Sequence, residues 1–116
     1  MHELSIAMSI VDIASRQAKA ASAENVCQVE LDIGILSGIE YESLEFALTI
    51  AKKDSIFENT YFKINRIEPL CECRSCKHLY SPGKEFGACP DCGNFNPEFI
   101  RGKELQIKSL TVEQKE

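Results

Sequence analysis

Five of the six cysteines in this 116-residue chain fall within residues 71–92, in the stretch CECRSCKHLYSPGKEFGACPDC. Four of them form two C-x-x-C pairs, Cys73 with Cys76 and Cys89 with Cys92. Each pair places two thiolates on one side of a tight turn, and two facing turns complete a tetrahedral four-sulfur shell that suits zinc. The spacing therefore predicts a structural zinc site. Because protein fills all four positions, the site has no room for a water to be activated, which argues against a metalloenzyme.

Three other side chains are expected to lie outside this shell. Cys71 falls outside the paired spacing, and His78 is expected to be a solvated loop residue because four thiolates already satisfy the metal. Cys27 alternates with apolar residues of an expected strand, so we expect a small core residue there. A thiol redox enzyme is a competing hypothesis. It would need one exposed, activated pair on a thioredoxin-like scaffold, and two matched pairs in a segment poor in aliphatic residues fit that requirement poorly.

The chain begins Met-His-Glu, and these residues form a second candidate ligand set. A free α-amine, the first peptide nitrogens and the imidazole of His2 can converge on one small cation, and nitrogen-rich square-planar sites favour Ni(II) or Cu(II). The amine and the imidazole both release protons near neutral pH when a metal competes, and Glu3 adds a carboxylate. On these three residues alone, the plainer interpretation is favoured: a helix start, with Glu3 near the positive end of the helix dipole.

Hydrophobic periodicity predicts the elements that must position these residues. In chain order they are a helix at 4–21, a strand at 26–36, a turn at 34–38, a second helix containing 44–50, a strand at 61–67 and a strand at 103–114. The last strand changes phase near Lys108 and Ser109, which indicates a bulge. Ile56 and Phe57, in the loop after the second helix, are expected to reach the core.

The apolar positions of these elements define the expected core. They are Leu4, Ala7, Met8, Val11, Ala14 and Ala18 in the first helix, flanked by Ile6, Ile10 and Ile13; Cys27, Val29, Leu31, Ile33 and Ile35 in the first strand; and Leu44, Phe46, Ala47, Leu48 and Ile50 in the second helix. The strand at 61–67 contributes Phe62 and Ile64. These patterns indicate elements with one buried face each.

Residues 69–100 contain all four prolines and five of the six cysteines, and few aliphatic residues. Such a segment cannot build its own hydrophobic core and needs a metal to hold it together. We therefore predict an α/β (α+β) fold with two helices packed on a small mixed β-sheet and an inserted zinc-ribbon-like domain. The expected domains are 1–68 plus 101–116 for the α/β part, and 69–100 for the zinc part.

The composition limits which classes of binding partner and which cellular compartment are expected. The formal net charge is -5, and residues 69–100 hold three basic side chains against four acidic ones, so binding to nucleic acid is disfavoured. No run approaches eighteen apolar residues, and no signal peptide is recognisable, so no membrane attachment is expected. A cytoplasmic protein is expected, where thiols stay reduced. A zinc-ribbon adapter that mediates protein docking is an alternative function that these features allow.

Taken together and in order, MHELS, DIGILSGIEYESLEFAL, CECRSCKHLYSP with CPDCG, and GKELQIKSLTVE cover nearly the whole chain. This combination resembles the HypA/HybF family, the nickel chaperones of [NiFe]-hydrogenase maturation. The resemblance implies a nickel-binding α/β domain and an inserted zinc domain. It implies nickel ligands at the Met1 amine, the backbone nitrogen and imidazole of His2, and Glu3. It implies zinc ligands at Cys73, Cys76, Cys89 and Cys92.

The resemblance also suggests Glu40, because some relatives carry an acidic residue near the nickel at this place. Its plainer interpretation is a solvated residue in the first turn of the second helix. The partners implied by the resemblance are a HypB-type GTPase and the large subunit of a [NiFe] hydrogenase, with urease maturation as a further destination for nickel. A metallochaperone of this kind carries a metal and catalyses no reaction. The sequence does not fix the oligomeric state and leaves a homodimer open.

Overall fold

The computed structural model describes residues 2–82 and 88–114. The chain divides into two compact units, and each is described here by itself. The first, which we call the helical unit, comprises Met1–Asp32, Ile39–Asn65 and Gln106–Glu116. The second, which we call the cysteine unit, comprises Ile33–Gly38 and Arg66–Leu105. Separately folding domains with the boundaries expected from the sequence remain a prediction.

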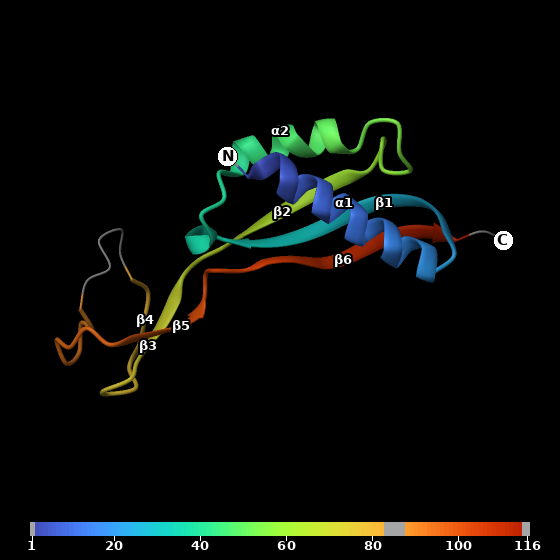
Figure 1. Cartoon of the computed structure of the whole chain (residues 1–116). Helices are drawn as coiled ribbons and strands as arrows, with labels where there is room; N and C mark the ends of the chain where they lie inside the picture. Colours follow the sequence, from blue (N-terminus) through green and yellow to red (C-terminus); the bar gives the residue numbers. More distant parts are fainter. Residues whose placement is uncertain (1, 83–87, 115–116) are drawn as a thin grey trace. The chain divides into compact units, whose positions relative to one another are not determined.

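The helical unit is built on a three-stranded sheet with two helices (Figure 1). Its elements are α1 (Glu3–Ala20), β1 (Ala23–Gly34), α2 (Tyr41–Ala51), β2 (Tyr61–Ile67) and β6 (Leu105–Gln114), and the strand order is β2-β1-β6. A short 3-10 helix, η1 (Ile35–Ser37), follows β1 at the expected turn. In the part of the chain that the structure describes, no helix is both long and apolar enough to cross a bilayer.

Contacts between the strands show that the sheet is mixed, as predicted. The Thr60 hydroxyl, just before β2, donates to the Val26 carbonyl, and Asn65 further along β2 donates to Asp32. Residue numbers therefore increase in the same direction along β1 and β2, so the two strands are parallel. The chain connects them by a crossover through α2. Along β6 the residue numbers increase in the direction opposite to those of β1. Ser109 donates to Glu30, whereas the later residue Glu113 accepts from the earlier residue Cys27. The β1–β6 pair is therefore antiparallel.

The core of the helical unit confirms the predicted alternation of β1 from Val29 onward. Val29 and Leu31 are buried, as are Leu44, Ala47 and Leu48 in α2 and Phe57 in the following loop. Ile33, the next residue of the alternation, is also buried. Cys27, however, is exposed, and Val26 is buried in its place. Burial thus changes phase between positions 26 and 29 of the strand. The expectation of a buried Cys27 was wrong because strict alternation was extended across that irregularity.

Other expected core positions are also exposed. In α1 the buried row is Glu3, Ala7, Ile10, Ala14 and Ala18, whereas Leu4, Met8 and Ile13 lie outside it. In α2, Phe46 and Ile50 are exposed, as are Ile35 after β1 and Ile56 in the loop. Helical periodicity defines an apolar sector but not which of its rows faces the neighbour. In α1 the row that turns inward is rich in alanine, which permits close approach.

The cysteine unit holds a second, smaller sheet with the order β4-β3-β5. The strands are β3 (Leu70–Cys73), β4 (Leu79–Tyr80) and β5 (Pro97–Arg101), and both pairings are antiparallel. Cys71 on the central strand pairs with Tyr80 on one side and with Phe99 on the other. The buried cluster at this sheet consists of Cys71, Cys73, Tyr80 and Cys89, so three of its four side chains end in sulfur.

Two glycines allow backbone segments of the cysteine unit to touch. A Cβ on Gly34 would lie 2.0 Å from the carbonyl oxygen of Gly102. Gly102 has a φ of 118°, a conformation that favours glycine. The Gly34 and Leu36 N–H groups donate to the Glu104 and Gly102 carbonyls, at 2.8 and 2.7 Å. This ladder ties residues 33–38 to the segment that follows β5.

Candidate metal sites

The two C-x-x-C pairs adopt the same local turn. The Lys77 N–H donates to the Cys73 carbonyl at 2.7 Å, and the Gly93 N–H donates to the Cys89 carbonyl at 2.9 Å. Lys77 and Gly93 both have positive φ, 67° and 79°. Glycine adopts such a φ readily, so Gly93 suits its turn, whereas a lysine gives no such signal in the sequence. These turns fix the two cysteines of each pair on one side of the backbone.

In each turn a second backbone hydrogen bond is donated by the N–H of the first cysteine to a carbonyl five residues later. The N–H of Cys73 donates to the His78 carbonyl and the N–H of Cys89 to the Asn94 carbonyl, both at 2.9 Å. A further bond, from the Arg74 N–H to the Asn96 carbonyl at 3.0 Å, links the first turn to the segment after the second. The backbone therefore holds the two turns facing each other.

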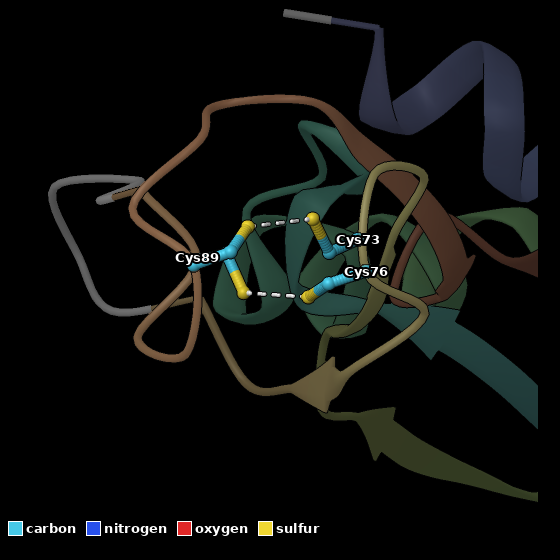
Figure 2. Close-up of side chains that lie close together, drawn as sticks. Cys73, Cys76 and Cys89 are labelled. Atoms are coloured by element: carbon cyan, nitrogen blue, oxygen red, sulfur yellow. Dashed lines mark hydrogen bonds between the residues drawn. The ribbon is translucent and has the colours of Figure 1, made fainter.

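The four predicted cysteine sulfurs come together between these turns (Figure 2). All four Sγ atoms lie within 4.8 Å of one another. Cys73 and Cys92 are 3.5 Å apart, and Cys76 and Cys89 are 3.6 Å apart. Four sulfurs around one zinc at 2.3 Å would be separated by about 3.8 Å. The donor set and its spacing therefore fit a tetrahedral zinc ion.

The thiols of this cluster differ in how readily they ionise. The backbone N–H of Cys76 is the main group that favours the Cys73 thiolate, and it helps to lower the pKa of Cys73 to about 7. A backbone hydrogen bond from His78 also favours the Cys76 thiolate, but burial and the neighbouring sulfurs outweigh it and raise the pKa of Cys76 to about 12. At neutral pH the metal-free cluster is thus not fully ionised, and a metal must displace protons.

The other sulfur and the other imidazole of this unit lie outside the cluster. The Cys71 thiol is fully buried between Tyr80 and Phe99, and burial raises its pKa. His78 is exposed, and its ring stacks on that of Tyr80 at 6.4 Å. Cys71 therefore packs the interior, and His78 covers the Tyr80 ring.

The N-terminal candidate set is only partly visible, because Met1 lies outside the described residues. His2 is exposed and immediately precedes α1, where its carbonyl accepts from the Ile6 N–H at 2.9 Å. Glu3 is buried, with 8% of its surface exposed, which is rare for a carboxylate. Its Oε2 accepts a hydrogen bond from the Glu40 N–H at 3.4 Å. The structure thus brings Glu3 and Glu40 together. Neither periodicity nor motif spacing indicated this contact, although the resemblance suggested Glu40 near the nickel ligands.

Glu40 has a local structural role of its own. It is the N-cap of α2, and its Oε1 accepts from the Glu42 N–H at 3.2 Å. Such a bond satisfies one of the unpaired N–H groups at the start of a helix. The Glu40 side chain therefore caps α2, while its backbone N–H donates to the Glu3 carboxylate.

With this geometry in place, comparison with known proteins places the chain in a class. The family model described as "Hydrogenase/urease nickel incorporation, metallochaperone, hypA" matches residues 1–112. The match therefore includes both the N-terminal segment and the four-cysteine cluster. It defines the chain as a metallochaperone, a protein that carries a metal, rather than an enzyme.

Similar proteins agree with this class. The chain is 41% identical over 112 residues to the hydrogenase maturation factor HypA of Parabacteroides distasonis, covering 97% of each. It is 38% identical over 113 residues to HypA of Chlorobium phaeobacteroides, covering 97% of this chain and 100% of the relative. The chain belongs to the HypA family of nickel metallochaperones for hydrogenase maturation, as the sequence resemblance predicted.

The fold agrees with a solved structure. The solution structure of the Ni metallochaperone HypA from Helicobacter pylori superimposes with a TM-score of 0.73 at 24% identity, covering 99% of this chain and 100% of the other. At that identity the likeness concerns the fold alone. It supports the predicted architecture of two helices with small sheets and a cysteine-bearing part.

Proposed function

We propose that this protein binds one Ni(II) ion through its N-terminal segment and delivers it to a maturing [NiFe] hydrogenase. The proposed ligands are the Met1 amine, the backbone nitrogen and imidazole of His2, and the Glu3 carboxylate. Nitrogen-rich sets of this kind favour Ni(II). Nickel is the cargo here, so the site must both hold the ion and release it.

The observation that carries this proposal is the contact between Glu3 and Glu40. It fixes a buried carboxylate at the first residue of α1, directly after an exposed imidazole. A ligand set at an exposed chain end can exchange its metal, whereas a closed shell exchanges slowly. Glu40 is a further candidate ligand, although its carboxylate already caps α2.

We also propose that Cys73, Cys76, Cys89 and Cys92 hold a structural zinc ion. Zinc would neutralise the crowded thiolates and join the two turns, and it would leave no position open for chemistry. The cysteines that the structure describes are free thiols, so a reducing compartment suits them, and we propose that the protein works in the cytoplasm.

The proposed partners are a HypB-type GTPase and the large subunit of a [NiFe] hydrogenase. A role in urease maturation is a second proposed destination, supported by the family description, which names hydrogenase and urease together. Proteins that pass a metal ion between them must bring their ligands close. The exposed position of His2 allows an approaching protein to reach it.

The proposal predicts that His2→Ala abolishes stoichiometric nickel binding. Loss of the imidazole removes a ligand that also fixes the chelate ring, so affinity should fall at least about tenfold, or about 1.4 kcal/mol. Isothermal titration calorimetry on untagged protein measures this directly. One glycine added before Met1 should have the same effect, because it moves the amine away from the imidazole.

The matched control is His78→Ala. The chain has two histidines, and His78 is exposed outside the four-sulfur cluster, so its loss should leave nickel affinity unchanged. Zinc content and circular dichroism should stay normal in all three variants. Unchanged nickel affinity in His2→Ala would refute the N-terminal site.

A further inference from the structure

A groove of about 360 Å³ lies within the helical unit, between α2 and β2. Leu48, Thr49 and Lys52 line it from the helix, and Tyr61, Phe62 and Ile64 line it from the strand. Of these lining residues, Leu48 is buried, whereas Tyr61 is 63% exposed. The groove thus joins apolar and polar surface, and none of the residues proposed to bind metal lines it.

The strand that borders this groove is at the edge of its sheet. The order β2-β1-β6 leaves one side of β2 without a neighbouring strand among the described residues. An edge strand turns part of its backbone N–H and C=O groups outward, where another strand can pair with them. Next to a helix, such an edge is a known way to bind an extended peptide: the backbone pairs with the edge and alternate side chains enter the groove.

The two ends of the groove carry opposite charge. The Lys52 ammonium lies at the end where β2 begins, donating to the Thr60 carbonyl at 3.0 Å and lying 6.0 Å from the centre of the Phe62 ring. Glu45 lines the groove two helical turns earlier on α2. An ammonium has three N–H groups, so Lys52 can hold this carbonyl and also bind a carboxylate.

We propose that this groove binds an extended segment of a partner protein, which adds to the sheet as a strand beside β2. Its apolar side chains would lie over Leu48 and Phe62, and an acidic residue would lie at Lys52. A groove of this volume is at the small end of ligand sites, which suits the side chains of one extended segment rather than a second folded surface. The proposal does not depend on how the protein binds nickel.

The test is a titration of the ¹⁵N-labelled full chain, without added nickel, with the peptide acetyl-Thr-Val-Thr-Val-Thr-Asp-amide. We expect saturable shifts of backbone amide signals confined to residues 48–52 and 60–64. Replacing the terminal aspartate of the peptide by lysine should weaken binding at least about fivefold, because the carboxylate partner of Lys52 is lost.

Two variants separate the groove from the rest of the surface. Thr49→Arg places a long side chain in the groove and should abolish the shifts, whereas Thr111→Arg, on exposed surface of β6 at the opposite edge, should leave them unchanged. Thermal melting confirms that both variants fold. Absence of saturable shifts at about 1 mM peptide would put the Kd above about 1 mM and would overturn the proposal. So would shifts that survive Thr49→Arg, or a dimer in sedimentation that Thr49→Arg dissociates, since a second copy would then occupy the groove.

Discussion

The two units of this chain have interiors of opposite kinds. The helical unit buries aliphatic and aromatic side chains, among them Leu31, Leu44 and Phe57. The cysteine unit buries three cysteines and Tyr80. Burial of hydrocarbon stabilises a fold by about 25 cal/mol per Å² of surface, and the first interior has far more of it to bury.

This difference shows how stability and metal handling are divided. The helical unit can hold its shape through packing alone, so the N-terminal segment proposed to bind nickel would not need the ion for its fold. The cysteine unit gathers four thiols that repel one another once ionised, and needs a cation to offset that repulsion. One metal would thus maintain structure and the other would be cargo.

The largest expected effect is loss of zinc from the cysteine unit. Cys73→Ser removes one thiolate, and structural zinc in small domains contributes about 10–16 kcal/mol of apparent binding free energy. We expect residues 70–82 and 88–101 to lose their dispersed NMR signals while the helical circular dichroism persists. Cys27→Ser, at an exposed cysteine outside the cluster, is the matched control and should keep its zinc. Full zinc content in Cys73→Ser, measured by elemental analysis, would contradict the four-thiolate shell.

The second largest expected effect is a loss of stability in the helical unit, caused by a cavity in its hydrophobic core. Leu31 is 1% exposed, and Leu31→Ala should lower the free energy of unfolding by about 2–5 kcal/mol. Zinc content should not change, because the four thiols lie in the other unit. Denaturant unfolding followed by circular dichroism measures the loss. Ile13→Ala, on the exposed surface of α1, should lower the free energy of unfolding much less. Equal losses in the two variants would contradict the assignment of Leu31 to the core and Ile13 to the surface.

The smallest effect concerns the cap of α2. Glu40→Ala removes the acceptor for the Glu42 N–H and should cost about 1 kcal/mol of stability. Glu40→Ser keeps a capping oxygen but no carboxylate, so its stability should stay near that of the original chain. Nickel calorimetry on the serine variant then isolates the ligand role. Weaker nickel binding there would make Glu40 a ligand, and unchanged binding would leave it a cap.

Much of this architecture could be read from the sequence because its signals were local. The C-x-x-C spacing determines a turn whatever surrounds it, and the four sulfurs meet as expected. The alternation from Val29 to Ile33 and the deep burial of Phe57 were likewise predictable. In β6 the half-buried residues change phase between Ile107 and Leu110, where the sequence placed an irregularity.

What could not be read depends on packing between elements. Met8 and Phe46 belong to apolar stripes yet are 60% and 68% exposed, because each helix buries a different row of its apolar sector, Ala7 and Ala14 in α1 and Leu44 and Leu48 in α2. The bond between Glu3 and Glu40 joins positions 37 residues apart and has no periodic signature. The positive φ of Lys77 follows from the geometry of its turn, not from its residue type.

The close approach of Gly34 and Gly102 bears on how this protein can be dissected. The chain crosses from one unit to the other after residues 32, 38, 65 and 105. Residues 33–38 therefore belong to the cysteine unit although they precede α2 in the sequence. A synthetic peptide of residues 66–105 would therefore lack the N–H groups of Gly34 and Leu36, which donate to the Glu104 and Gly102 carbonyls. Anyone who transplants the thiol cluster onto another scaffold should carry that short upstream segment with it.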